Sequence, residues 1–225
     1  MATEPQASTS TIHHLILLLT VAAVSIRAAS MDDTAAATAP SAADSRSAAS
    51  AFLRASCATT LYPSLCHDSL LPYASEFQTS HPRLARAAAG VAAAHLRSLS
   101  ACVKDILRHG HEPEGGGGRP SETAALRDCA STISTAANLA EQSSAELTKL
   151  EPAAGGCSSR QARWVVDNAK TWLSAAMTNE GTCADGLDEG GGATAVPAGK
   201  EVMACVASVR QYTSNALALV NGIQL

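Results

Sequence analysis

Aromatic residues are scarce in this chain of 225 residues, at 3% of the sequence. Strands favour aromatic and β-branched residues, whereas alanine, which occurs 47 times, is the strongest helix former. The scarcity argues against a β-sandwich or barrel and favours an all-α protein. Basic residues are not in excess either, because 16 Lys and Arg stand against 20 Asp and Glu. This balance lacks the basic character of a nucleic-acid-binding protein, so no nucleic-acid partner is expected.

Long apolar runs are also few. The run Ile12–Ile26 is shorter than the roughly 20 residues that a membrane-spanning helix needs, and small residues follow it at Ala28–Ser30. We therefore interpret residues 1–30 as a secretory signal peptide cleaved after Ser30, with an uncleaved membrane anchor as the alternative. Residues 31–50 are rich in Ala, Ser, Thr and Asp, which predicts a disordered lead-in. The mature chain is expected to be secreted and free of the membrane.

Apolar residues recur at spacings of three and four through four long segments, which predicts four amphipathic helices. Their expected positions are Pro82–His109, Ser121–Leu150, Ser159–Cys183 and the segment after Pro197. The apolar stripe expected on the first helix is Leu84, Ala88, Val91, His95, Cys102 and Ile106. Glycine and proline clusters between the segments predict short connectors. Four such helices make an up-down-up-down bundle.

Two shorter helices, Ala51–Cys57 and Ser64–Phe77, are expected before the bundle. Cys57 and Cys66 could close them into a hairpin. The sequence therefore predicts one disulfide-bonded, all-α domain over residues 51–225. Its expected parts are a helical hairpin at 51–78 and a four-helix bundle at 82–225.

The seven cysteines show none of the spacings of a zinc site. With an export signal, disulfides are the expected state. Seven is an odd number, so at least one thiol is left over or pairs between molecules.

Two polar clusters could suggest a metal site. The first contains His109, His111, Glu112 and Glu114, and the second contains Asp185, Asp188 and Glu189. The first lies in a glycine-rich connector, and the second lacks the alternating oxygen ligands of an EF-hand. We interpret them as a solvated loop and a solvated acidic turn, so no metal or cofactor is expected.

Cys66 beside His67 could suggest the thiol of a hydrolase. A short disulfide explains Cys66 better, and no nucleophile motif occurs elsewhere. We therefore expect no catalytic residues, although an enzyme with an unrecognised site remains an alternative. A secreted helical carrier of a small apolar ligand is another.

Four motifs stand in order along the chain. They are Cys57 and Cys66 around Tyr62-Pro63, Ala-Leu-Arg-Asp-Cys at 125–129, Thr-Trp-Leu-Ser-Ala-Ala-Met-Thr-Asn-Glu-Gly-Thr-Cys-Ala-Asp-Gly-Leu at 171–187, and Thr-Ser-Asn-Ala-Leu-Ala-Leu at 213–219. Together they closely resemble the motifs of the plant invertase and pectin methylesterase inhibitor family, over roughly residues 50–225.

This resemblance implies a four-helix bundle behind a helical hairpin, with disulfides Cys57–Cys66 and Cys129–Cys183. It also implies an inhibitor domain rather than an enzyme, acting in the apoplast and cell wall. The last motif and Thr171–Ala176 look more like the pectin methylesterase side of the family. The implied activity is a stoichiometric complex of a monomeric inhibitor with pectin methylesterase, which blocks the pectin-binding cleft. Inhibition of a cell-wall or vacuolar acid invertase is the alternative, although the Pro-Lys-Phe motif frequent in invertase inhibitors is missing.

The same resemblance places the inhibitory face on the second and third long helices. The expected contact residues are Ser131, Thr135, Thr178, Asn179 and Thr182. The alternative is that the polar residues near Cys183 only cap and pack the helix. Family members often carry an acidic residue and a tyrosine two and four residues after the cysteine at 129, where this chain has Ser131 and Ile133.

Three cysteines lie outside the implied pairs. An up-down bundle places Cys102 and Cys205 at a similar height on adjacent helices, near the Cys129–Cys183 bridge. We predict that these two face each other, close enough for a third disulfide, and that Cys157 is the odd thiol. Two reduced cysteines serving as small core residues are the alternative.

Overall fold

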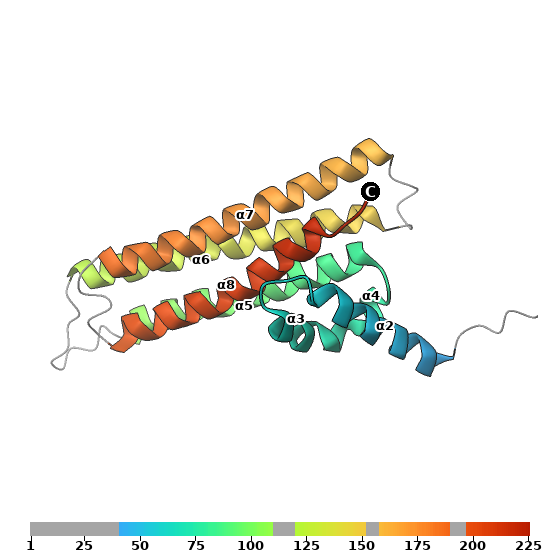
Figure 1. Cartoon of the computed structure of the whole chain (residues 1–225). Coiled ribbons are helices and arrows are strands. Elements are labelled where there is room, and N and C mark those ends of the chain that lie inside the picture. The colour runs from blue at the N-terminus through green and yellow to red at the C-terminus, as the bar shows by residue number, and fades with distance from the viewer. Residues whose placement is uncertain (1–40, 110–119, 152–157, 190–196) are drawn as a thin grey trace, which may run out of the picture. The chain divides into compact units, whose positions relative to one another are not determined.

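The computed structural model describes residues 41–109, 120–151, 158–189 and 197–225, and these form helices without strands (Figure 1). The α-helices are α2 (Ala42–Cys57), α3 (Pro63–Leu70), α4 (Ala74–Phe77), α5 (His81–His109), α6 (Pro120–Leu147), α7 (Ser159–Glu189) and α8 (Pro197–Asn221). Two 3₁₀ turns, η1 (Leu71–Tyr73) and η2 (Thr148–Leu150), follow α3 and α6. The all-α prediction is confirmed.

Helix α2 begins nine residues earlier than the sequence predicted. Ser41 is its N-cap: the Ser41 hydroxyl accepts a hydrogen bond from the Asp44 backbone N–H, and the Asp44 carboxylate accepts one from the Ser41 N–H. This capping box satisfies two donors that would otherwise lack partners at the helix start. The prediction of disorder is therefore wrong for residues 42–50. Residues 31–40 and the predicted signal peptide at 1–30 lie outside the described residues.

The prediction of a single helix from Ser64 to Phe77 is also wrong. The chain instead forms α3, η1 and α4 in succession. Pro72 explains the interruption, because proline has no N–H for the Asp68 carbonyl and its ring clashes with that carbonyl. A disulfide between Cys57 and Cys66, with Cα atoms 5.6 Å apart, ties the end of α2 to α3.

The four long helices agree with their predicted positions except at two ends. The prediction ended the third helix at Cys183, but α7 continues to Glu189. Leu187, one turn beyond Cys183, is fully buried, so the added turn extends the apolar stripe. Helix α6 ends at Leu147, and its predicted last residues form η2.

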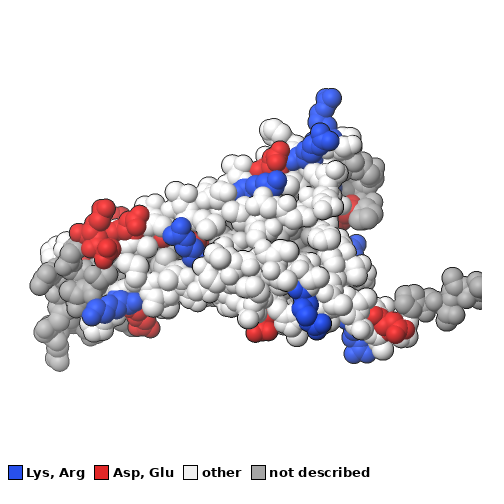
Figure 2. All heavy atoms as spheres, viewed as in Figure 1, with Lys and Arg blue, Asp and Glu red and all other residues white. Residues whose placement is uncertain are grey.

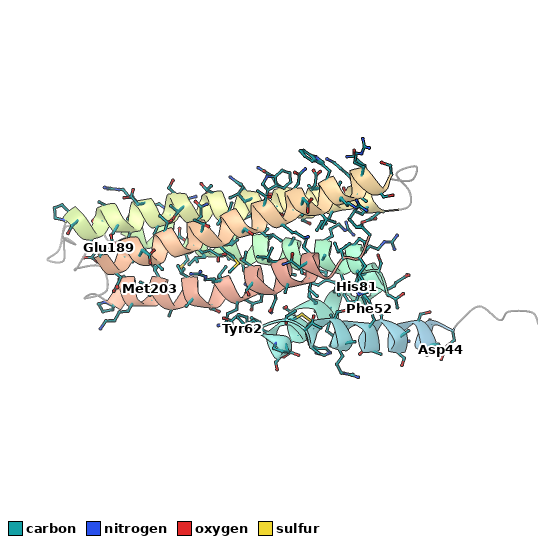
Figure 3. The ribbon with its side chains drawn as sticks, turned by 45° about the horizontal axis from the view of Figure 1, so that its top comes forward. Asp44, Phe52, Tyr62, His81, Glu189 and Met203 are labelled. Carbon is teal, nitrogen blue, oxygen red and sulfur yellow. A yellow bond between two sulfur atoms is a disulfide. The ribbon has the colours of Figure 1, made fainter. Side chains whose placement is uncertain are left out.

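The long helices form an up-down-up-down bundle in which each packs against two neighbours, in the order α5, α6, α7, α8 and back to α5. Figures 1 and 3 show α6 beside α7 and α5 beside α8, with α2, α3 and α4 next to the α5–α8 pair. The end of α7 at Glu189 and the start of α8 near Met203 lie at the same end of the bundle (Figure 3). The bundle prediction is confirmed.

Small side chains let these helices approach closely. On α5, Ala85, Ala89 and Ala92 are fully buried. The hydroxyl of Ser144 on α6 donates to the Arg86 carbonyl of α5 (3.1 Å), a side chain-to-backbone contact that requires closely packed helices. The core is therefore filled mainly by alanine with branched aliphatic residues, rather than by aromatics.

The predicted apolar stripe of α5 is rotated from the observed one. Cys102 is exposed and His95 is half-buried, whereas the neighbouring Leu96, Leu99 and Val103 are buried. The apolar pattern of an alanine-rich helix leaves its inner face ambiguous by about one residue, or 100°. His95 and Cys102 lie instead at the edge that α5 shares with α8.

An asparagine of α8 holds the turn between α2 and α3. The Asn215 side chain accepts from the Tyr62 N–H (3.2 Å) and donates to the Tyr62 carbonyl (3.0 Å). Tyr62 is labelled beside α8 in Figure 3. Two motifs 153 positions apart in the sequence thus meet in one contact. In the described part of the chain, the helices fall short of the length and apolar character needed to cross a membrane.

Candidate protein-binding face

The Cys129–Cys183 disulfide fixes the pairing of α6 with α7. Its Cα atoms are 4.2 Å apart, and both cysteines are buried. Because the bridge joins two antiparallel helices, it sets which turn of α6 lies opposite which turn of α7. The predicted contact residues lie within about two turns of this bridge.

A second contact extends the same register. The Asn168 amide of α7 donates to the Glu146 carboxylate of α6 (3.3 Å). Eleven residues are about three helical turns, so Asn179 lies on the same side of α7 as Asn168, and Thr135 on the same side of α6 as Glu146. In antiparallel helices these steps run in the same direction in space. Thr135 and Asn179 are therefore placed opposite each other where α6 meets α7.

The three threonines among the predicted contact residues are exposed and locally hydrogen-bonded. Each hydroxyl donates to the carbonyl four residues earlier: Thr135 to Ser131 (3.1 Å), Thr178 to Ser174 (3.1 Å) and Thr182 to Thr178 (3.0 Å). These bonds hold the side-chain rotamers, while the methyl groups stay at the surface. A partner protein would thus meet an ordered surface of short polar side chains.

The remaining two predicted residues border this surface. Ser131 is exposed, and Asn179 is half-buried, with its amide donating to the Ala175 carbonyl (2.8 Å). The Asn179 side-chain oxygen keeps its capacity to accept. We call Ser131, Thr135, Thr178, Asn179 and Thr182 the α6–α7 face. The structure brings all five residues to the same stretch of two neighbouring helices.

Acidic residues border the face at one end. Asp185, Asp188 and Glu189 are exposed in the last turns of α7, and Figure 2 shows acidic side chains gathered at this end of the bundle. They lie at the negative end of the helix macrodipole, which is an unfavourable position for carboxylates. The prediction of a solvated acidic turn is wrong in form, because these exposed residues belong to the last turns of α7. Among the described residues no group of three potential ligands is arranged to hold a metal ion.

Sequence reasoning missed one buried charged residue next to the face. Glu180 is fully buried between α7 and α8, and the Thr213 hydroxyl of α8 donates to its carboxylate (2.5 Å). Burial raises the pKa of Glu180 to about 7, although the Thr213 hydrogen bond and the charge of Arg210 both act to lower it. Its position in the spacing Leu173, Ala176, Glu180, Cys183, Leu187 could have revealed it, since the other four are core residues.

The C-terminal motif is structural rather than part of the face. Thr213 binds Glu180, and Asn215 binds the backbone of Tyr62, and both motif residues are buried. These bonds join α8 to α7 and to the α2–α3 turn.

The other candidate chemical groups lie outside the α6–α7 face and do not form a common site in the described residues. Cys66 is bonded to Cys57, and His67 contacts the neighbouring Asp68 carboxylate (3.1 Å). Cys102 and Cys205 carry free thiols. The cluster from His111 to Glu114, and Cys157, lie outside the described residues.

Comparison with known proteins agrees with this architecture. The family model described as plant invertase/pectin methylesterase inhibitor matches residues 51–219. Pectinesterase inhibitor 11 of Arabidopsis thaliana is 35% identical over 192 residues, which are 84% of this chain and 88% of that protein. Pectinesterase inhibitor 9 of the same plant is 34% identical over 182 residues, or 80% and 84%. The 21 kDa protein of Daucus carota is 32% identical over 180 residues, or 80% and 87%.

No solved structure matches the chain. The family model nonetheless spans both disulfides, the α6–α7 face and the C-terminal motif. On these grounds the chain belongs to the plant invertase/pectin methylesterase inhibitor family.

Proposed function

We propose that this chain is a secreted inhibitor of pectin methylesterase that acts in the plant cell wall as a stoichiometric complex. The observation that carries the proposal is the joint presence of inhibitor relatives along most of the chain and a bridged, polar face on α6 and α7. The names of those relatives supply the target, and the face supplies a surface on which a protein could dock.

Inhibition in this proposal is steric. The α6–α7 face covers the pectin-binding cleft and excludes the polysaccharide, so no side chain needs to perform chemistry. A stable protein complex of ordinary size buries roughly 800 Å² on each partner, which two adjacent helix faces can supply. The threonine hydrogen bonds and the disulfide hold the face in one conformation before binding. Little conformational entropy is then lost in the complex.

The inhibitor acts as a monomer in this proposal, because one bundle presents the whole face. Its expected compartment is the apoplast, where the two disulfides persist. The same fold could serve against an acid invertase, and an assay of both enzymes separates these targets.

The test measures inhibition of purified pectin methylesterase and acid invertase by the purified chain, at mildly acidic pH. The chain should titrate the esterase to a one-to-one end point and leave the invertase active. Inhibition of the invertase alone would move the chain to the other branch of its family. Size-exclusion chromatography with light scattering checks that the free inhibitor is a monomer.

Two variants test the position of the face. Thr182→Arg and Asn179→Arg place a bulky cation in the expected contact, and each should weaken the complex by about 30-fold or more. Thr171→Arg is the matched control: it lies on the same helix, it makes the same kind of hydrogen bond (to the Asp167 carbonyl, 2.8 Å), and it is about 16 Å from Thr182.

The control variant should inhibit like the unmodified chain. Equal inhibition by all three variants, with unchanged circular dichroism, would show that the face lies elsewhere. Loss of helical signal in a variant would remove it from the comparison, and Thr182→Lys would replace it.

A further inference from the structure

Two free thiols lie on the α5–α8 pair, on the far side of the bundle from the α6–α7 face. Cys102 is on α5 and is exposed, and Cys205 is on α8 and is half-buried. Neither thiol forms a disulfide in the structure; Cys205 packs against the edge of the core, whereas Cys102 is exposed. Their relative position follows from a neighbouring contact.

The rings of His95 and Tyr212 stack between the same two helices. Their centroids are 3.9 Å apart and their planes differ by 17°. This stack shows which side of α5 meets which side of α8, and at what height.

Seven residues are almost two full turns of an α-helix, so a side chain seven positions along lies on nearly the same side. Cys102 is seven residues after His95, and Cys205 is seven residues before Tyr212. Since α5 and α8 are antiparallel, both steps run toward the same end of the bundle. The register of the stack therefore places Cys102 opposite Cys205.

The electrostatic surroundings agree with this position. Partial burial raises the pKa of the Cys102 thiol, and negative charge on Cys205, Glu201 and Asp105 raises it further. The raised pKa favours the protonated thiol of Cys102 over its thiolate.

We propose that Cys102 and Cys205 form a redox-active dithiol, a modification site that reduces a small-molecule disulfide and in doing so links α5 to α8. The exposed Cys102 thiol loses its proton and attacks one sulfur of the small disulfide. This forms a mixed disulfide and releases one small thiolate, which takes up a proton. Cys205 then loses its proton and attacks the Cys102 sulfur, which releases the second small thiol. Two protein thiols are oxidised and one small disulfide is reduced to two thiols.

The fold can supply the geometry that this bond requires. A disulfide needs Cα atoms within about 7 Å and converging side chains. The α6–α7 pair of this bundle meets the requirement, with 4.2 Å between the Cα atoms of Cys129 and Cys183. The α5–α8 pair contains buried alanines on α5 and holds two stacked rings at 3.9 Å, so its helices also run close together.

The new bond would cross-link the edge of the helix ring that lies opposite the Cys129–Cys183 bridge. One disulfide joins α6 to α7, and the second would join α5 to α8, so all four helices would be covalently paired. Denatured chains would then have less freedom, which raises the melting temperature.

The test treats the purified full chain with oxidised glutathione at about pH 9, because alkaline pH increases the thiolate fraction of Cys102, the attacking group. In the unmodified chain Cys102 and Cys205 should both lose their free thiols without retaining glutathione, and peptide mapping should identify Cys102 linked to Cys205. Its Tm should rise by about 5 °C or more. Cys157→Ser, the matched control, should behave in the same way. Cys205→Ser should retain glutathione on Cys102 and show no rise.

These readouts are independent of enzyme inhibition, so the dithiol can fail while the proposed function stands, and the reverse also holds. Three results would overturn the dithiol: a bond from Cys157 to either cysteine, disulfide-linked dimers as the main product, or stable glutathione on Cys102 of the unmodified chain.

Discussion

Two opposite edges of the bundle are built from the same antiparallel geometry and closed in different ways. At the α6–α7 edge a disulfide joins Cys129 to Cys183, and the exposed side chains are short and hydrogen-bonded to their own helix. At the α5–α8 edge a ring stack of His95 on Tyr212 and two free thiols occupy the corresponding positions. The first edge is covalent and ordered at its surface, and the second depends on noncovalent contacts.

This difference between the two edges indicates which surface must keep its conformation. A partner that is excluded or bound by shape requires a surface that does not rearrange, and the α6–α7 edge has such a surface. The α5–α8 edge instead carries the docked helices α2 to α4, so it already has a covering. Of these two edges, the disulfide closes the one that carries no docked helices.

Removal of the long disulfide should produce the largest loss of unfolding free energy among the changes that test this comparison. The double variant Cys129→Ser, Cys183→Ser opens a loop of about 55 residues, for which the chain-entropy relation gives about 4 kcal/mol of unfolding free energy. The matched variant Cys57→Ser, Cys66→Ser opens a loop of about ten residues and should cost about 2.7 kcal/mol. Urea denaturation followed by circular dichroism measures both.

The α5–α8 edge, whose two cysteines are free thiols, provides the reference for that experiment. Cys102→Ser removes an exposed thiol and should change the free energy of unfolding by less than about 0.5 kcal/mol. A greater loss from the short bridge than from the long one would contradict the loop-length argument. It would show that the hairpin, rather than the α6–α7 edge, limits stability.

Glu180 should make the stability of the bundle depend on pH. Its folded pKa is raised from 4.5 to about 7, so between these values the native chain holds a proton that the unfolded chain has lost. The stabilising contribution is fully present below the unfolded value and is lost as pH rises through the folded one. From pH 4.5 to above 7 the loss should approach about 3 kcal/mol. Glu180→Gln should remove this slope, as measured by urea denaturation at a series of pH values.

The control for this slope is Glu141→Gln, which removes an exposed carboxylate paired with Arg97. It should keep the pH dependence of the unmodified chain. His95 acts with the opposite sign, because burial lowers its pKa and its contribution is lost as pH falls. That contribution is common to all three proteins and cancels between them. A Glu180→Gln variant with an unchanged slope would mean that Glu180 titrates normally.

Much of the architecture could be predicted from the sequence because it depends on the periodic spacing of apolar residues and on the glycines and prolines that end helices. The apolar spacing gave the four long helices, and the glycine-rich segments gave their separations. The family resemblance gave the pairing of Cys57 with Cys66 and of Cys129 with Cys183, which spacing alone cannot decide. The helix start at Ala42 was missed because the capping signal of Ser41 and Asp44 lies in a low-complexity segment.

The parts that escaped prediction depend on contacts between helices. Glu180 occupies a core position of α7, but only its partner Thr213 on α8 shows how one of its oxygens is satisfied. Asn215 resembles a family motif residue, and its role appears only once Tyr62 lies beside it. The α6–α7 face was placed on its helices by resemblance. The alignment of Thr135 with Asn179 needed the register that the Glu146–Asn168 contact supplies.

The smallest expected effect concerns the ring stack at the α5–α8 edge. A double-mutant cycle of His95→Ala and Tyr212→Ala should give a coupling of about 1 kcal/mol, the usual value for packed rings beyond their area. The control cycle pairs His95→Ala with Ser208→Ala, which removes an exposed side chain of α8 and should give a coupling near zero. Urea denaturation at about pH 8, where His95 is neutral, measures both cycles. A stack coupling no larger than the control would mean that the rings do not pack in solution. The register that sets Cys102 opposite Cys205 would then lose its support. The α5–α8 edge would also be held together less firmly, relative to the α6–α7 edge, than the structure indicates.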